Sequence, residues 1–182
     1  MSASLYTEVN IGKPLKYEHK MKFTDFTLVS EDGAQFLCHR VVLAAQSSVL
    51  RRMFLTPMEE RETSSLQLDY KADLVEKFVR FFYETKIQEE EEEGNLRGFL
   101  DLSEKYNIPH LKEEVERLAM RKLTVENMVE MFFLAEFYSA EDLKKGAEDF
   151  IKINRMKVKE GLAELEKLEP NQRMKILSIC IV

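Results

Sequence analysis

The sequence of 182 residues predicts a mixed α+β protein that is mostly α-helical, with a small β-sheet covered by helix hairpins and an all-α extension after it. Apolar residues alternate with other residues over 25–30, just before a Glu-Asp-Gly turn near residue 32, and further along they recur at helical spacing. Glycine and proline are scarce, at 6 and 4 residues, which favours long helices over loops. With 45% apolar residues, the chain can form a core without metals or disulfides.

The first predicted element is a β-hairpin. Alternating residues at 25–30 run into the turn residues 31–33, and a second run follows at 34–38. Both strands are apolar on both faces, so helices are expected to cover at least one face of the sheet.

Two short helices and a third strand are expected next. Residues 41–45 form a compact helical turn, and Ser47 is expected to cap a second helix that stops at Thr56 and Pro57. A short strand is expected at 66–68.

A buried central helix and a solvated loop follow. Apolar residues recur at i, i+4, i+7 and i+8, with two valines widening the stripe: Leu74, Val75, Phe78, Val79, Phe81 and Phe82. The run Glu89–Glu93 then concentrates like charges that cannot be buried unpaired, which predicts a loop in solvent.

The remaining chain predicts helices in pairs. Residues 96–106 and 111–119 each carry one apolar face, and the break at Asn107–Pro109 indicates an antiparallel hairpin. Thr124 precedes a helix that carries Met128, Phe132 and Ala135.

The last helices continue this architecture. Ser139 and Asp142 form a box-like start for a helix over 143–151. Residues 158–168 and 171–177 are expected to form a final pair.

Charge and cysteine content favour an intracellular protein that binds other proteins. A net charge of −6 and a pI near 5.3 argue against nucleic acid, because duplex binding needs clustered Lys and Arg. Cys38 and Cys180 lie far apart in apolar runs, which suits a reduced nuclear or cytoplasmic setting. Neither a leader segment nor an apolar stretch long enough to span a membrane is recognised, so we expect no export and no membrane.

The sequence offers no catalytic, cofactor or metal motif. His19, His39 and His110 are widely separated and lack ligand spacing, and neither nucleophile elbow nor phosphate-binding glycine loop is present. We therefore expect a protein without enzymatic activity, cofactors or metals, although a catalytic site assembled only in three dimensions is an alternative.

Two segments resemble a known family. Residues 23–28 and 36–54 are similar to the core of the BTB/POZ family, with an Asp before the first strand, a His and a basic residue before an apolar helix, and a Ser-led helix ending in Met-Phe. Residues 123–128 and 134–144 resemble the helical 3-box or BACK-like extension that follows this domain in speckle-type POZ proteins.

The resemblance implies a domain organisation. It places a BTB/POZ domain at 23–121 and a helical extension at 122–182, with the N-terminal segment 1–22 contributing to a dimer interface. Speckle-type POZ proteins carry a substrate-holding MATH domain ahead of the BTB domain. Only 22 residues precede Phe23 here, so we expect no such domain.

The resemblance also implies a homodimer interface, formed by the N-terminal segment, a charged pair and the first helix: Leu15, Tyr17, Asp25, Arg40, Val41, Val42 and Ala45. Two alternatives stay open. Leu15 and Tyr17 can anchor a loop within the chain, and Asp25 with Arg40 can be a structural ion pair that joins strand to helix.

A second implied surface binds cullin-3. The family uses a hydrophobic-x-Glu motif after the Met-Phe helix, and Met58 and Glu60 stand there. An adaptable methionine can fill a pocket while the carboxylate accepts hydrogen bonds; alternatively, Met58 packs into its own core. The family also implies contacts by an aromatic residue and by the extension, at Tyr83, Leu123, Val125 and Met128. Most extension residues must also pack their own helix pair.

The implied function is that of a non-enzymatic, dimeric adaptor of a cullin-3 RING E3 ubiquitin ligase, acting in protein ubiquitination with substrates that the sequence does not name. Its partners would be cullin-3 and a second copy or a related BTB protein. The alternative is a BTB homo- or heterodimerisation scaffold without cullin binding, such as a transcriptional co-factor or a modulator of longer relatives.

Overall fold

The computed structural model describes residues 23–56, 64–87, 95–160 and 166–181. The chain divides into two compact units, residues 1–46 with 51–85 and residues 47–50 with 86–182. Several predicted features lie outside the described residues, among them Leu15, Tyr17, Met58, Glu60, the tract Glu89–Glu93 and part of the helix expected at 158–168.

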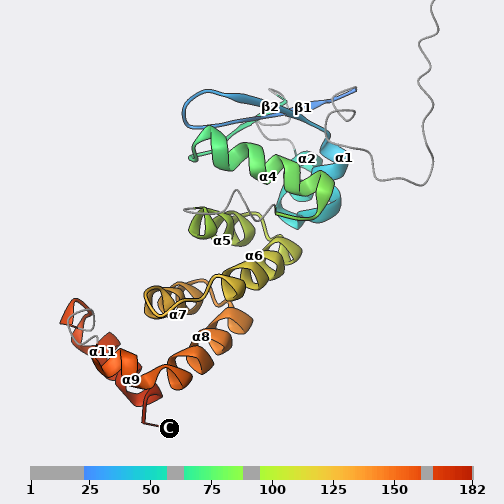
Figure 1. Cartoon of the computed structure of the whole chain (residues 1–182). Helices are drawn as coiled ribbons and strands as arrows, with labels where there is room; N and C mark the ends of the chain where they lie inside the picture. Colours follow the sequence, from blue (N-terminus) through green and yellow to red (C-terminus); the bar gives the residue numbers. More distant parts are fainter. Residues whose placement is uncertain (1–22, 57–63, 88–94, 161–165, 182) are drawn as a thin grey trace, which may run out of the picture. The chain divides into compact units, whose positions relative to one another are not determined.

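The first unit contains a three-stranded sheet (Figure 1). Strand β1 (Phe26–Val29) pairs antiparallel with β2 (Gln35–Cys38) and parallel with β3 (Ser65–Gln67), which gives the order β2-β1-β3. The predicted hairpin is confirmed, and the third strand begins one residue earlier than expected. Gly33 has a φ of 83° in the turn, a conformation that glycine adopts without strain.

Three helices accompany this sheet: α1 (Arg40–Gln46), α2 (Ser48–Leu55) and α4 (Ala72–Glu84). Helix α4 lies along one face of the sheet (Figure 1) and buries all six apolar residues of the predicted stripe. It ends where Thr85 takes a left-handed φ of 55° and its N–H bonds to the Phe81 carbonyl at 2.8 Å. The α+β class and the buried central helix are both confirmed.

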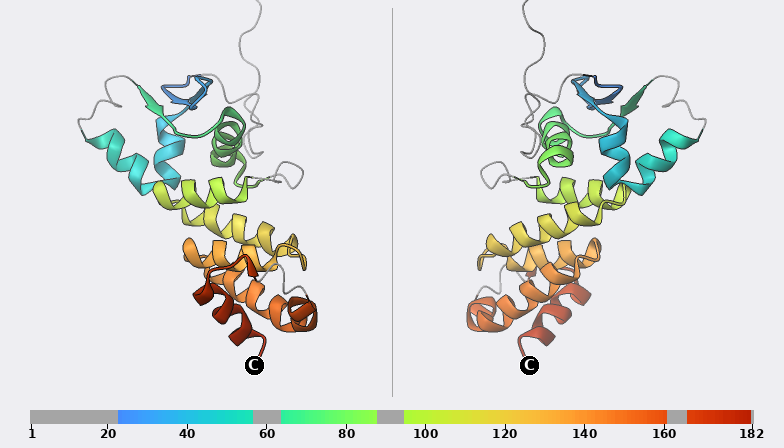
Figure 2. Two further views of the ribbon diagram at one scale, coloured as in Figure 1. Left: turned by 90° about the vertical axis from the view of Figure 1, so that its left-hand side faces the viewer. Right: turned by 90° about the vertical axis from the view of Figure 1, so that its right-hand side faces the viewer.

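The second unit is helical. It contains α5 (Leu96–Lys105), α6 (Pro109–Arg121), α7 (Met128–Phe137), α8 (Glu141–Ile153), α9 (Arg155–Glu160) and α11 (Pro170–Ile179). Helix α5 packs beside α6, and α7 beside α8 (Figures 1 and 2). A buried cluster from α7, α8, α9 and α11 forms one core: Met128, Phe132, Ala147, Ile151, Val158, Ile176 and Cys180.

The predicted cap at Ser47 is present. The Leu50 N–H donates to Ser47 Oγ at 3.0 Å, and the Ser47 hydroxyl donates to the Tyr106 carbonyl at 2.6 Å. One buried side chain therefore satisfies an orphan amide of α2 and ties the start of this helix to the end of α5.

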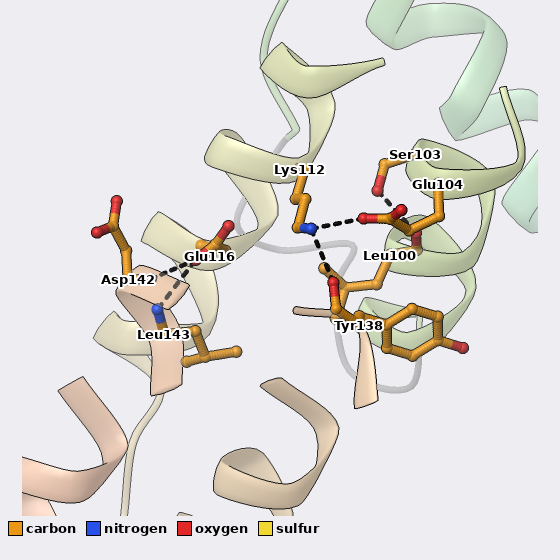
Figure 3. A network of polar contacts seen from close by, with 8 residues as sticks. All are labelled: Leu100, Ser103, Glu104, Lys112, Glu116, Tyr138, Asp142 and Leu143. Atoms are coloured by element: carbon orange, nitrogen blue, oxygen red, sulfur yellow. Dashed lines mark hydrogen bonds and ion pairs between the residues drawn. The ribbon is translucent and has the colours of Figure 1, made fainter. Parts of the chain in front are cut away.

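The predicted box at the start of α8 is wrong. Ala140 occupies the N-cap position, and Ser139 has a left-handed φ of 49°. The cap instead comes from α6, where Glu116 Oε2 accepts the N–H groups of Asp142 and Leu143 at 2.9 and 3.0 Å (Figure 3). A buried carboxylate at a helix N-terminus satisfies two orphan amides and complements the helix dipole.

A lysine on α6 joins the same helices. Lys112 Nζ donates to Glu104 Oε1 on α5 and, at 2.7 Å, to the Tyr138 carbonyl at the end of α7 (Figure 3). With Glu116, this residue fixes α6 to the corner between α7 and α8. The second unit is thus held by polar contacts as well as by its apolar core.

The buried carboxylate of Glu114 makes stability depend on pH. Two hydrogen bonds from Arg117, at 2.9 and 2.7 Å, lower the pKa of Glu114 below its ordinary value of 4.5. A carboxyl with a depressed folded-state pKa stabilises the protein above its unfolded pKa, and this contribution is lost as pH falls through the folded pKa.

We expect Glu114→Gln to lower the free energy of unfolding at pH 7 and to have a smaller effect below pH 4.5. Urea denaturation at both pH values measures this difference. An equal loss at both pH values would show that the charge of Glu114 does not stabilise the fold.

Candidate functional site

A tyrosine near the end of α4 is anchored by His39 within the first unit. The His39 backbone N–H donates to Tyr83 Oη at 3.0 Å, and His39 Nδ1 lies 2.8 Å from the same oxygen. The two rings meet edge to face, with centroids 6.0 Å apart. The Tyr83 hydroxyl is thus bonded to another residue of the same unit. Because Tyr83 is only half-buried, part of this residue remains accessible to solvent.

The predicted pair Asp25 and Arg40 is bonded through the backbone. Asp25 Oδ1 accepts the Arg40 N–H at 2.8 Å, which satisfies an amide in the first turn of α1. The Arg40 guanidinium carbon lies 5.2 Å and 5.5 Å from the ring centroids of Phe26 and Phe54, and Nη2 donates to Ser64 Oγ at 2.8 Å. Asp25 thus joins strand to helix through the Arg40 backbone amide, and a dimer-interface role of the two residues stays a prediction.

Helix α1 presents an apolar face to solvent. Val41 is 75% exposed, and Ala45, one turn further on, is also exposed. Val42 is half-buried, and Leu43 is completely buried. Two exposed apolar residues at i and i+4 form a continuous strip along this helix.

The connection from α6 to α7 positions the predicted extension residues. The Thr124 N–H donates to Asn127 Oδ1 at 2.8 Å, and the Asn127 N–H donates to Thr124 Oγ1 at 3.3 Å. Leu123 and Val125 pack, partly buried, against the core of the second unit, whereas Met128 is 2% exposed and belongs to it. Met128 therefore packs within its own helix pair, and its contact with a partner stays a prediction.

A groove of about 860 Å³ lies within the second unit along α7. Its apolar surface comes mainly from α7 and the turn before it: Val125, Val129, Met131, Phe133, Leu134 and Phe137. Charged residues around it include both signs: Arg97, Glu126, Glu130, Lys157 and Lys167. Phe137 is 73% exposed, so this groove offers a large aromatic side chain to a partner.

From the sequence we predict one apolar face on helix α7, formed by Met128, Phe132 and Ala135. The signal for the groove was nevertheless present, because α7 reads Met-Val-Glu-Met-Phe-Phe-Leu-Ala-Glu-Phe and is apolar on more than one side. A helix that packs on only one face has a polar opposite face. The groove is lined by apolar residues from around α7, including Met128 of the core face as well as Met131, Leu134 and Phe137.

The described residues contain no group of three or more His, Cys, Asp or Glu side chains arranged to hold a metal ion. Burial raises the pKa of Cys38 to about 12, so this thiol stays protonated at neutral pH. Across the parts of the chain that the structure describes, the helices are too short or too polar to cross a membrane.

Comparison with known proteins agrees with this architecture. The family model of the BTB/POZ domain matches residues 15–123. Kelch-like protein 23 of Pongo abelii is 33% identical over 124 residues, which cover 68% of this chain and 22% of that protein. TD and POZ domain-containing protein 4 of Mus musculus is 29% identical over 153 residues, or 84% of this chain and 41% of that protein.

A third relative is Kelch repeat and BTB domain-containing protein 8 of Xenopus tropicalis, which is 27% identical over 132 residues, or 72% of this chain and 22% of that protein. The matched region thus spans between 22% and 41% of these relatives' own lengths. The family match covers more than half of the chain and includes the sheet, α1, α2, α4, α5 and α6. The chain belongs to the BTB/POZ domain family.

Proposed function

We propose that this chain is a non-enzymatic adaptor module that binds cullin-3 and forms a homodimer. The observation that carries the proposal is the family match over residues 15–123, which contains Met58, Glu60 and Tyr83. The hydrophobic-x-Glu motif stands after α2, where BTB adaptors of this kind contact the cullin. On this proposal the BTB domain covers 23–121 and a 3-box or BACK-like extension covers 122–182.

The groove along α7 supports a contribution of the extension. Its surface includes Val125 and the exposed ring of Phe137, and its volume of about 860 Å³ falls within the range of concave binding sites. On this proposal Val125 contacts the cullin directly, while Leu123 and Met128 shape the groove from the core. A protein segment with bulky apolar side chains would fit this surface.

The exposed strip on α1 supports dimerisation. Val41 and Ala45 would be buried between two copies, together with Leu15, Tyr17 and Val42, and this would remove apolar surface from water. A dimer would offer two cullin sites and raise the effective concentration of the ligase at a multivalent target.

We expect light scattering to give about twice the chain mass of 21.4 kDa. Val41→Glu should shift the protein toward the single-chain mass while leaving its melting temperature within a few degrees, because this side chain is exposed in the folded chain. A monomer at micromolar concentration for the unmodified chain would contradict the dimer.

A pull-down from cell lysate with the tagged chain tests the adaptor proposal. We expect cullin-3 to be captured, along with the substrates that this adaptor brings to the ligase in the nucleus or cytoplasm. A chain that forms a dimer but captures no cullin-3 would favour the alternative, a BTB dimerisation scaffold.

A further inference from the structure

We propose that His39 is a positioning residue for partner binding, and that it acts by holding the Tyr83 ring in the orientation that the partner contacts. This inference rests on the proposed function, in which Tyr83 lies at the cullin surface.

Two hydrogen bonds join His39 to the hydroxyl of Tyr83. When His39 Nδ1 is unprotonated, it accepts the phenolic proton across 2.8 Å, and the hydroxyl oxygen accepts the His39 backbone N–H at 3.0 Å. Both the position of Oη and the direction of its O–H are then set by His39.

His39 is itself fixed by the helix that follows it. Its carbonyl accepts the N–H groups of Val42 and Leu43 at 3.0 and 3.1 Å, at the start of α1. The end of α1 holds the same turn of α4, because Gln46 Nε2 donates to the Phe82 carbonyl at 2.5 Å. His39, just before α1, therefore holds the side chain of Tyr83. Gln46, at the end of α1, holds the backbone of the same turn of α4.

This arrangement determines what Tyr83 can offer to a partner. Because its hydroxyl is already bonded to His39, we expect a partner to contact the aromatic ring of this half-buried residue. Tyr83→Phe keeps that ring but releases it from His39, and the freed ring must lose rotamer entropy when the partner binds. If the ring alone mattered, the Phe variant would bind as tightly as the wild type.

The test is a set of calorimetric titrations of the full chain with the N-terminal region of cullin-3. We expect His39→Leu to weaken binding by about five- to tenfold, the effect of losing the one hydrogen bond to Nδ1, and Tyr83→Phe to weaken it by at least as much, because it also loses the bond from the His39 backbone N–H. The double variant should be no weaker than Tyr83→Phe alone, because that variant already lacks the bond that His39→Leu removes. His39→Asn should stay within about twofold of wild type, since its amide oxygen can accept the phenolic proton.

Gln46→Ala is the matched control. It removes the bond to the backbone of the same turn without touching the Tyr83 hydroxyl, so it should lower the melting temperature and leave the affinity of the folded protein unchanged. Additive losses in the double variant, or an Asn variant as weak as the Leu variant, would overturn the positioning role. Absence of binding by the wild type would overturn the proposed function instead.

Discussion

Replacing Phe132 with alanine is expected to lower the free energy of unfolding by about 3–5 kcal/mol, because the substitution leaves a cavity in a packed core. Phe132 is completely buried in the second-unit cluster, and its ring packs edge to face against Phe133 with centroids 5.2 Å apart. Chemical denaturation followed by circular dichroism measures the change.

Phe137→Ala is the control on the same helix. Its ring is 73% exposed, so its removal should change the free energy of unfolding by less than about 0.5 kcal/mol. The same variant should weaken cullin binding, because Phe137 lines the groove. Equal destabilisation by the two variants would contradict the division of α7 into a core face and a partner face.

Met58→Asp is expected to weaken cullin-3 binding by roughly thirtyfold or more, because forcing a charge into an apolar pocket costs about 2 kcal/mol. The free energy of unfolding should not change if Met58 faces the partner. Calorimetric titration and denaturation of the same sample separate these two quantities.

Met174→Asp is the matched control, since Met174 is 68% exposed on α11 and lies far along the chain from the motif. It should change neither stability nor affinity. If Met58→Asp instead unfolds the protein, Met58 packs into its own core, as the alternative interpretation of the motif holds.

Local sequence patterns predicted most of the elements. The β1–β2 hairpin follows from alternation around Gly33, and α4 follows from apolar residues on one helical face. Ser47 was predicted as a cap because the bond that it accepts comes from a residue only three positions away. Each of these features depends on residues that are close in the sequence.

Contacts between distant residues escaped prediction. The cap of α8 comes from Glu116, which lies 26 residues before Asp142, and the Tyr83 hydroxyl is held by a residue 44 positions away. Periodicity reports which face of a helix is apolar, but it does not report which neighbour covers that face. The family resemblance implies Met128 as a partner contact, and the structure adds that Met128 is 2% exposed and Phe137 73% exposed.

The family resemblance supplied what periodicity could not. It implies a partner contact at Tyr83 and at the connection from α6 to α7. The structure adds that the Tyr83 hydroxyl is bonded to His39 and that Val125 lines a groove. The proposed adaptor role thus rests on a family contact motif together with the His39–Tyr83 pair and the groove along α7.

The most direct test is isothermal titration calorimetry of the purified chain with the N-terminal region of cullin-3. We expect saturable binding with one cullin for each chain, and weaker binding by Met58→Asp at unchanged stability. Absence of binding by the wild-type chain, confirmed by separate elution of the two proteins in gel filtration, would contradict the proposed adaptor role.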